Sequence, residues 1–348
     1  MKSPNLGILG IAAAVLVTSA ISSAAESGYH LLKTYKFGAA PGAKSEYFDY
    51  VTVDSAARRV YLGRGTAVQV LNADTGASFG FITGFQRQHG VAVAPEFGHG
   101  FITDGAAGTI TIFDLKTMKR ISDVKAQPDA DCMLYDPASK YAFSMNGDSN
   151  SSTVVNAKTG EFVKNISLGG SPEFAVADGK GKVFANLADK DQIDVIDTKT
   201  LEVTSHWPTA PDGHPTALAI DTEHHRLFSA GRSPQNLAII NADTGKIIQT
   251  FPIAAGTDAA RFDPATGMIF VSTTAGEIDV FHEDSPDKYT ALDPIKSEYG
   301  AKTMGLDAKT HELFLDTADF SATSASTNGR GGRRMAQPGT FRVLVYGK

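Results

Sequence analysis

The sequence has 348 residues, of which 42% are hydrophobic and 20% charged, and its 34 Gly and 15 Pro indicate a globular chain with many turns. The sequence has 32 Lys and Arg residues and 38 Asp and Glu residues, which gives a net charge of −6. This balance argues against sequence-independent nucleic-acid binding, which needs a basic surface. Cys132 is the sole cysteine, which excludes an internal disulfide and covalent c-type haem.

Residues 1–25 have the pattern of a secretory signal peptide. A short basic start is followed by an apolar run from Leu6 to Ile21 and by the small residues Ser23, Ala24 and Ala25. We therefore expect cleavage before Glu26 and a periplasmic or extracellular (secreted) protein. The alternative is a membrane anchor, but the run is short and ends in small residues. No later segment reaches about 18 consecutive apolar residues, so no membrane span is expected after signal removal.

Residues 26–348 contain seven copies of one repeat. Each copy has a short apolar run that ends at an aligned position, usually Asp, and the copies are 40 to 44 residues apart. The aligned positions are Asp54, Ala94, Asp136, Asp178, Asp221, Asp263 and Asp307. Further β-branched and aromatic runs follow in each copy, separated by Gly, Asp and Asn, which predicts strands joined by tight turns. The phrase Asn-Ala-Asp-Thr-Gly, at 72–76 and 241–245, is predicted to be one such turn.

Four strands per repeat and seven repeats predict an all-β fold, a single seven-bladed β-propeller of four-stranded antiparallel blades. An open solenoid is the alternative, but it would need polar capping repeats at both ends. The last repeat is one strand short, ending with the run at 341–346, and the run at 30–37 supplies the missing strand. The N-terminal strand is therefore expected to close the ring, making residues 26–348 one domain.

The repeats resemble the YncE-like, or YVTN-repeat, seven-bladed β-propellers exported by bacteria. The resemblance covers nearly all of residues 26–348. It is carried by Val-Tyr-Leu-Gly at 60–63, Val-Gln-Val-Leu-Asn-Ala-Asp-Thr-Gly at 68–76, His-Gly-Val-Ala-Val at 89–93 and Pro-Gly-Thr-Phe-Arg-Val-Leu-Val at 338–345. It implies the propeller fold, but this family has no single agreed activity, so no catalytic residue is carried over.

Polar residues recur at the start of the first strand of each repeat, where a propeller opens into a funnel. Five residues before the aligned position the chain has Asp49, His89, Asp131, Glu173, Thr216, Asp258 and Lys302. One interpretation is a hydrated polar channel. The other is a metal site in which Asp49, His89, Asp131 and Glu173 hold Zn, Mn, Fe or Ca. Lys302 weakens the metal interpretation because it could neutralise part of the acidic charge.

A second layer of candidates follows the second strand of several repeats and opens on the same face. Its members are Arg64, Asp104, Asn146, Arg232 and Thr273. Arg64 and Arg232 are expected to clamp a carboxylate or phosphate, or else to be solvated loop charges. An insertion at about 318–339 carries Arg330, Arg333 and Arg334 and is expected to form either a lid over the funnel or a flexible surface loop.

The sequence has no H-E-x-x-H, Walker A or G-x-G-x-x-G motif. The leading hypothesis is a binding protein that holds a small molecule or an envelope protein at the funnel, with Arg64, Asp104, Asn146, Thr216, Arg232 and Lys302 around the ligand. The alternative is a metal-dependent, lactonase-like hydrolase or lyase with Asp258 as base. A propeller that only scaffolds envelope proteins is a third hypothesis, and the oligomeric state stays open.

Overall fold

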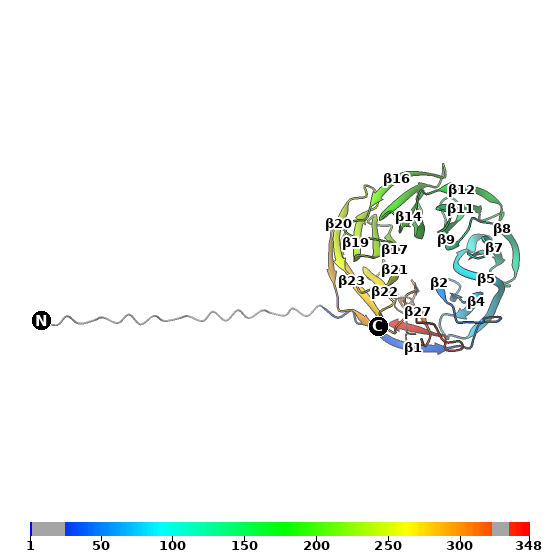
Figure 1. Cartoon of the computed structure of the whole chain (residues 1–348), viewed down its shortest axis with the longest axis horizontal. Helices are drawn as coiled ribbons and strands as arrows, with labels where there is room; N and C mark the ends of the chain where they lie inside the picture. The colour runs from blue at the N-terminus through cyan, green and yellow to red at the C-terminus, as the bar shows by residue number, and fades with distance from the viewer. Residues whose placement is uncertain (2–24, 322–333) are drawn as a thin grey trace, which may run out of the picture.

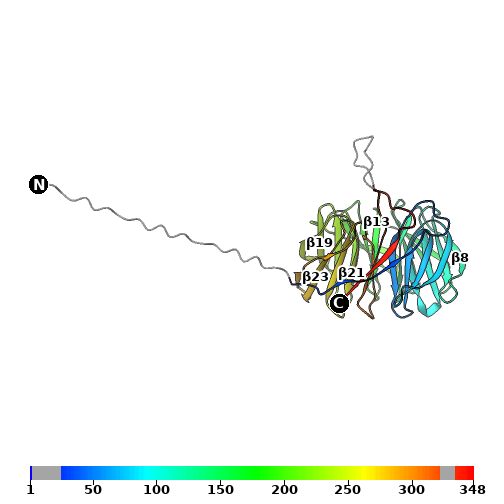
Figure 2. The same cartoon turned by 90° about the horizontal axis from the view of Figure 1, so that it is seen from below.

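The computed structural model describes Met1, residues 25–321 and residues 334–348. The predicted signal peptide falls largely outside the described residues, as do Arg330 and Arg333. In the described part the fold is all-β, with 28 strands and one short 3₁₀ helix, and the prediction of a seven-bladed propeller is confirmed. Figure 1 shows the blades as a ring around a central axis, and Figure 2 shows the same ring from its side. The inner strands line a hollow along this axis, which we call the channel.

Each blade is an antiparallel sheet of four strands whose first strand lies at the channel. Blade 1 contains β2 (Asp49–Asp54), β3 (Arg59–Gly63), β4 (Gly65–Asn72) and the first part of β5 (Ser78–Ala94). Blade 2 contains the second part of β5, helix η1 (Pro95–Phe97), β6 (His99–Asp104), β7 (Thr109–Asp114) and β8 (Arg120–Lys125). Blade 3 contains β9 (Ala130–Asp136), β10 (Tyr141–Asn146), β11 (Ser151–Asn156) and β12 (Phe162–Ser167). Blade 4 contains β13 (Pro172–Ala177), β14 (Lys182–Leu187), β15 (Gln192–Asp197) and β16 (Glu202–Pro208).

The remaining blades follow the same plan. Blade 5 contains β17 (Pro215–Asp221), β18 (Arg226–Arg232), β19 (Gln235–Asn241) and β20 (Ile247–Pro252). Blade 6 contains β21 (Thr257–Asp263), β22 (Met268–Thr273) and β23 (Glu277–Ser285), and in place of a single fourth strand it has two short ones, β24 (Lys288–Ala291) and β25 (Ile295–Lys296), which both pair with β23. Blade 7 contains β26 (Met304–Leu306), β27 (Leu313–Thr317), β28 (Arg342–Gly347) and β1 (His30–Lys36). Within blade 7, β1 pairs antiparallel with β28, from His30 opposite Gly347 to Lys36 opposite Arg342, so the two ends of the chain share one sheet.

The repeated sequence phrases are turns, as predicted. The Oδ1 atom of Asn72 accepts hydrogen bonds from the backbone N–H groups of Asp74 (3.0 Å) and Thr75 (2.9 Å). Gly76 closes the turn with φ +69°, a conformation that glycine adopts without strain. Asn241 makes the same pair of hydrogen bonds in blade 5. The Asn-Ala-Asp-Thr-Gly segment therefore recurs because its residues stabilise the backbone of a tight turn.

The core lies between the blades. The second strand of every blade carries one aromatic side chain that is at most 1% exposed, and these residues are Tyr61, Phe101, Phe143, Phe184, Phe228, Phe270 and Phe314. Burying each such ring stabilises the fold by about 1.5–3 kcal/mol. The packed blades hold the seven inner strands around the channel, so the residues that start these strands meet at one end of it. Within the part of the chain that the structure describes, no helix has the length and hydropathy of a membrane span.

Candidate functional site

The inner strands of blades 1–6 each have an irregular register at the end that opens into the channel mouth. In β5 the ladder shifts between Gln88 and Val91, and comparable shifts occur near the starts of the other five strands. A bulge inserts an extra residue and re-aims the side chains around it. His89, between Gln88 and Val91, and Asp258, between Thr257 and Ala259, are at such positions.

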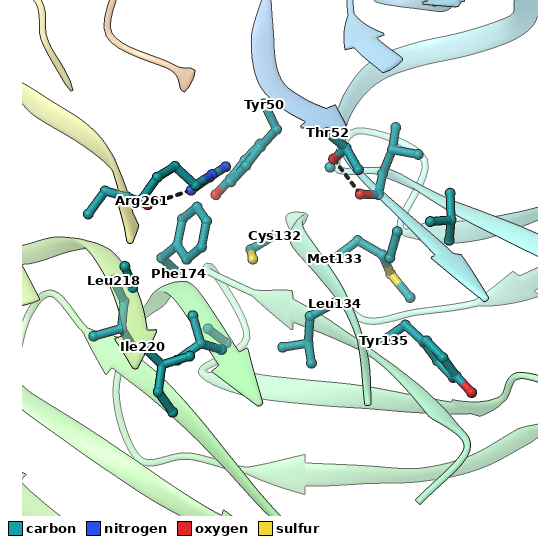
Figure 3. A pocket seen from close by; sticks show the side chains of 18 of the residues that line it. Tyr50, Thr52, Cys132, Met133, Leu134, Tyr135, Phe174, Leu218, Ile220 and Arg261 are labelled. Carbon is teal, nitrogen blue, oxygen red and sulfur yellow. Dashed lines mark hydrogen bonds between the residues drawn. The ribbon is translucent and has the colours of Figure 1, made fainter. Parts of the chain in front are cut away.

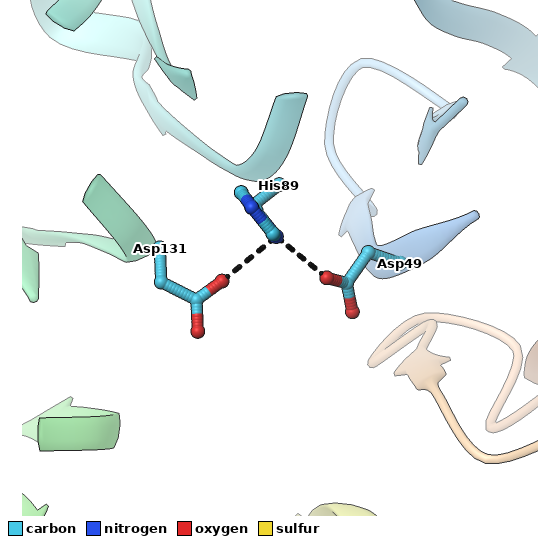
Figure 4. Close-up of side chains that lie close together, drawn as sticks. All are labelled: Asp49, His89 and Asp131. Carbon is cyan, nitrogen blue, oxygen red and sulfur yellow. Dashed lines mark hydrogen bonds and ion pairs between the residues drawn. The ribbon is translucent and has the colours of Figure 1, made fainter. Parts of the chain in front are cut away.

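Three of the predicted metal ligands meet at the mouth, from blades 1, 2 and 3 (Figure 4). The Nδ1 atom of His89 lies 2.7 Å from Oδ2 of Asp49 and 3.0 Å from Oδ1 of Asp131. One ligand atom from each residue lies within 4.8 Å of the other two. The side chain of His89 is 3% exposed, and those of Asp49 and Asp131 are 13% and 18% exposed. We call this group the Asp49–His89–Asp131 cluster.

The charges in the cluster shift one another's protonation. Burial opposes the charged form of His89, but its contacts with Asp131 and Asp49 outweigh burial and raise the pKa to about 10. Burial also opposes ionisation of Asp49, yet the His89 hydrogen bond and the Lys302 charge leave its pKa below the usual value. The pKa of Asp131 is raised by burial, despite its close contact with His89. The metal-free cluster is thus an imidazolium between two carboxyl groups.

Two tyrosines that the sequence analysis missed support this cluster. The Tyr47 hydroxyl donates to Oδ2 of Asp49 (3.0 Å) and lies 3.1 Å from Nδ1 of His89. The Tyr50 hydroxyl donates to Oδ2 of Asp131 (3.2 Å). Among the described residues, Oδ1 of Asp131 and Nε2 of His89 are buried without a hydrogen-bond partner. The close pair of Asp131 and His89 is therefore an ion pair without hydrogen-bond geometry, and a cation would satisfy the free oxygen.

Glu173 is the fourth predicted metal ligand. It is not one of the three residues whose ligand atoms lie within 4.8 Å of one another. Burial, followed by the charge of Asp131, raises the pKa of Glu173 to about 7. Glu173 adds to an excess of acidic groups on this side of the mouth.

The other side of the mouth is basic. Arg232 and Lys302 both form ion pairs with Asp258, and Nε of Arg232 donates to the backbone oxygen of Thr257 (2.9 Å). The side chains of Arg232 and Lys302 are 35% and 32% exposed, so both remain accessible from the mouth. Asp258, by contrast, is occupied by two cations, which disfavours the predicted role of a general base.

Arg64 does not line the funnel, contrary to the prediction of a ligand clamp. Its guanidinium is buried, with Nη2 2.6 Å from Oε1 of Glu46 and Nη1 donating to Oε1 of Gln69 (2.6 Å). It also stacks on the Phe341 ring, with Cζ 3.6 Å from the centroid. The Arg64 guanidinium is engaged in a buried ion pair and in hydrogen bonds within the fold, so it is not available to a ligand.

Three further predicted ligand-binding residues are also buried structural groups. Asp104 accepts hydrogen bonds from the backbone N–H groups of Gln86 (2.7 Å) and Arg87 (3.0 Å). Asn146 donates to the hydroxyls of Ser151 and Thr153, and Thr216 donates to the backbone oxygen of His214 (2.9 Å). Each of the three side chains makes hydrogen bonds within the fold, so this arrangement gives no support to the prediction that they surround a ligand.

The expected basic lid at 318–339 is described only at its ends. Arg334 lies over the Tyr299 ring, 4.6 Å from the centroid, and Phe320 forms a bridge with Ala336. The lid itself stays a prediction.

A second His and carboxylate group lies at the opposite end of the inner strands. Nδ1 of His224 is 2.7 Å from Oδ2 of Asp221 and 3.0 Å from Oε1 of Glu283. The His224 side chain is 42% exposed, so water screens this group far more than the buried cluster at the mouth. It is the natural competitor for metal in any binding experiment.

No protein-family model matches the sequence, and no curated protein matches it. Several solved structures share the fold. The RRP9 WD40 repeats match with a TM-score of 0.73 at 9% identity, over 93% of this chain and 99% of that chain. U3-55K matches with a TM-score of 0.71 at 9% identity, over 92% of this chain and 99% of that chain. Hydrazine synthase of Kuenenia stuttgartiensis matches with a TM-score of 0.66 at 12% identity, over 80% of this chain and 96% of that chain. At such identities these similarities show a β-propeller fold.

Proposed function

We propose that this protein is a binding protein whose channel mouth holds a divalent cation through Asp49, His89 and Asp131, and a small anionic ligand beside it. The observation that supports this most strongly is the convergence of one imidazole nitrogen and two carboxylate oxygens, from three consecutive blades, within 4.8 Å. The propeller fold is compatible with a binding or scaffold role, since propellers carry many functions in the loops and strand ends around their channel.

The donor set favours Zn²⁺ or Mn²⁺. An imidazole with carboxylates suits these ions, whereas Ca²⁺ prefers a shell of six to eight oxygens. Without an ion, one imidazolium offsets only one of the two carboxylates. Burial, with a smaller effect of neighbouring carboxylates, raises the pKa values of Asp131 and Glu173. A divalent ion would compensate this charge and contact the free Oδ1 of Asp131.

The ligand is proposed to bridge this ion and the basic side of the mouth. Arg232 and Lys302 share one carboxylate, Asp258, so the three groups keep a net positive charge. A carboxylate or phosphate of a small molecule would bind there through charge-assisted hydrogen bonds. The hydrolase alternative gains no support from this arrangement, because the carboxylate expected to act as base is occupied by both cations.

Export and family are proposed on the sequence patterns alone. The signal at 1–25 supports a periplasmic or extracellular location, and the motifs at 60–76, 89–93 and 338–345 support membership of the YncE-like propellers.

Elemental analysis of the protein after incubation with Zn²⁺ and desalting tests the proposal. We expect about one ion per chain in the wild type and its loss in the His89→Ala, Asp131→Ala double variant. His206→Ala is the matched control, because His206 contacts a single carboxylate, Asp194, at 2.6 Å. His224→Ala controls for the competing group. A wild type that retains no ion, or a double variant that retains as much as the wild type, would refute the cation site.

A further inference from the structure

A cavity of about 370 Å³ lies in the channel and is lined by residues that follow the strand starts of the mouth, with Tyr50 among them (Figure 3). The inner strands of blades 1–6 supply its walls, which are largely apolar and include Leu134, Val176, Ile220 and Phe262. Arg261 is the single charged residue among those that line it. A cavity of this size and lining is typical of sites for small organic molecules.

Arg261 reaches across the channel without an acidic partner. Its Nη1 donates to the backbone oxygen of Ala260 (2.7 Å), and its Nη2 lies 3.5 Å from the backbone oxygen of Val51 in blade 1. Its Cζ lies 5.3 Å from the centroid of Phe174 in blade 4. The ionisable neighbours that act on it in the described chain are Cys132 and Tyr50, and neither is a carboxylate.

The guanidinium thus has unused hydrogen-bonding capacity. It carries five N–H donors, and two backbone oxygens occupy only part of them. Burial lowers the pKa of Arg261 to about 10, so it is still a cation at neutral pH. A cation in an apolar cavity without a counter-ion destabilises the folded chain, and an anion in the cavity would remove that cost.

We infer that the cavity is a binding site for a small amphipathic carboxylate, whose carboxylate pairs with Arg261 and whose apolar body packs on Leu134, Ile220 and Phe262. Arginine binds carboxylates through two parallel hydrogen bonds, and Cζ of Arg261 lies over the Phe174 ring, 5.3 Å from its centroid. The Tyr50 hydroxyl donates to Oδ2 of Asp131 (3.2 Å). The inference does not rest on the cation site, since neither Arg261 nor the apolar wall belongs to the Asp49–His89–Asp131 cluster.

Calorimetric titration of the wild type with benzoate and hexanoate, and with the neutral isosteres benzamide and hexanamide, tests the inference. We expect each carboxylate to bind at least about tenfold more tightly than its amide, the usual gain of a charge-assisted hydrogen bond. In Arg261→Met that ratio should fall to about one, while Arg120→Met, which removes an arginine that pairs with Asp123 on the outer strand β8, should keep it. Arg261→Lys retains the charge without the planar fork, and we expect a reduced preference that still favours the carboxylate.

Thermal unfolding separates ligand binding from a purely structural role of Arg261. Ligand-free Arg261→Met should unfold at the same or a higher temperature than the wild type, because an unpaired buried charge is removed. A lower unfolding temperature of both Arg261→Met and Arg261→Lys would show that the side chain is a structural plug and would overturn the inference. So would a wild type that binds the carboxylates no better than the amides, or an Arg261→Met protein that binds them as well as the wild type does.

Discussion

His89 faces three oxygens with one nitrogen. Its Nδ1 lies 2.7 Å from Asp49, 3.0 Å from Asp131 and 3.1 Å from the Tyr47 hydroxyl. A single N–H group cannot satisfy three oxygens, and a metal ion would need the lone pair on the same atom. A proton and a metal ion therefore compete for one position, and this competition makes cation binding depend on pH.

The first prediction concerns that competition. Because the pKa of His89 is raised to about 10 in the metal-free protein, binding of Zn²⁺ or Mn²⁺ at neutral pH should release about one proton. Affinity should fall by about tenfold for each unit that the pH drops below that pKa. Calorimetry of Mn²⁺ binding in buffers of different ionisation enthalpy measures the proton directly. Binding without proton release would contradict a role for Nδ1 of His89.

Glu173 gives a second, independent pH effect. Its folded pKa is raised to about 7, above the ordinary value, so its contribution to stability is complete at low pH and is lost as the pH rises through about 7. Glu173→Gln should therefore match the wild type at pH 4 and be about 1–2 kcal/mol more stable at pH 8. Denaturant titration at the two pH values measures this, with the exposed Glu223→Gln as control. A Glu173→Gln protein that is less stable at pH 8 would show that its ionised form is favoured in the fold.

The residue scale is where prediction from sequence was weakest. Aligning the repeats places Asp49, His89 and Asp131 at strand starts, and the structure brings them together. The same alignment placed Arg64 and Asn146 near the mouth, yet both side chains turn into the blade, because position along a strand does not give side-chain direction beside a bulge. Arg261 carried an overlooked signal. Its equivalents in the other repeats are all uncharged, namely Thr52, Ala92, Leu134, Val176, Ala219 and Gly305.

At the scale of elements, the turns show how local chemistry fixes a strand pair. In the turn at 72–76 the Asn side chain substitutes for backbone partners, and the closing glycine has positive φ. A Cβ atom on Gly76 would overlap the ring of Tyr35 in β1, and a Cβ atom on Gly245 would overlap the ring of Trp207 in β16. The glycine thus also makes room for an aromatic residue of the preceding blade's outer strand. Through this packing the turn of one blade contacts the outer strand of the preceding blade. The sequence of the repeat did not predict this contact.

Gly76→Ala tests this linkage. The substitution adds strain at φ +69° and a clash with Tyr35, and we expect a loss of about 2–4 kcal/mol in the free energy of unfolding. Gly169→Ala is the matched control, because Gly169 has φ +76° and nothing within 4 Å of an added Cβ, so it should lose only about 1–2 kcal/mol. Equal losses in urea titrations of the two variants would show that the Tyr35 contact contributes nothing.

At the scale of the whole molecule, the fold was the most predictable property. A repeat of 40 to 44 residues with four strands predicts one blade per repeat. It also predicts that the blades pack into a ring, because each blade buries its apolar faces only against its neighbours. The seven blades do not form seven separate sheets. Strand β5 runs without a break from Ser78 to Ala94 and joins blades 1 and 2 in one sheet of seven strands. The sequence did not reveal this, because the bend between two blades has no distinct residue pattern here.

Deleting residues 26–38 tests how much the ring depends on β1. The deletion removes the pairing with β28 and the packing of Tyr35 and Tyr29, and it exposes the edge of β28. We expect a loss of more than about 3 kcal/mol in the free energy of unfolding, with aggregation on storage. Lys36→Ala, which changes one exposed side chain of β1, should unfold like the wild type. A deleted protein with the wild-type unfolding midpoint would refute closure by the N-terminal strand.

The cation at the mouth is tested most directly by anomalous diffraction at the zinc edge, from crystals of the protein grown with Zn²⁺. We predict one strong peak at about 2.0–2.2 Å from Nδ1 of His89 and from a carboxylate oxygen of both Asp49 and Asp131. A structure with no peak at this position, or with a peak only at Asp221, His224 and Glu283, would contradict the proposed site.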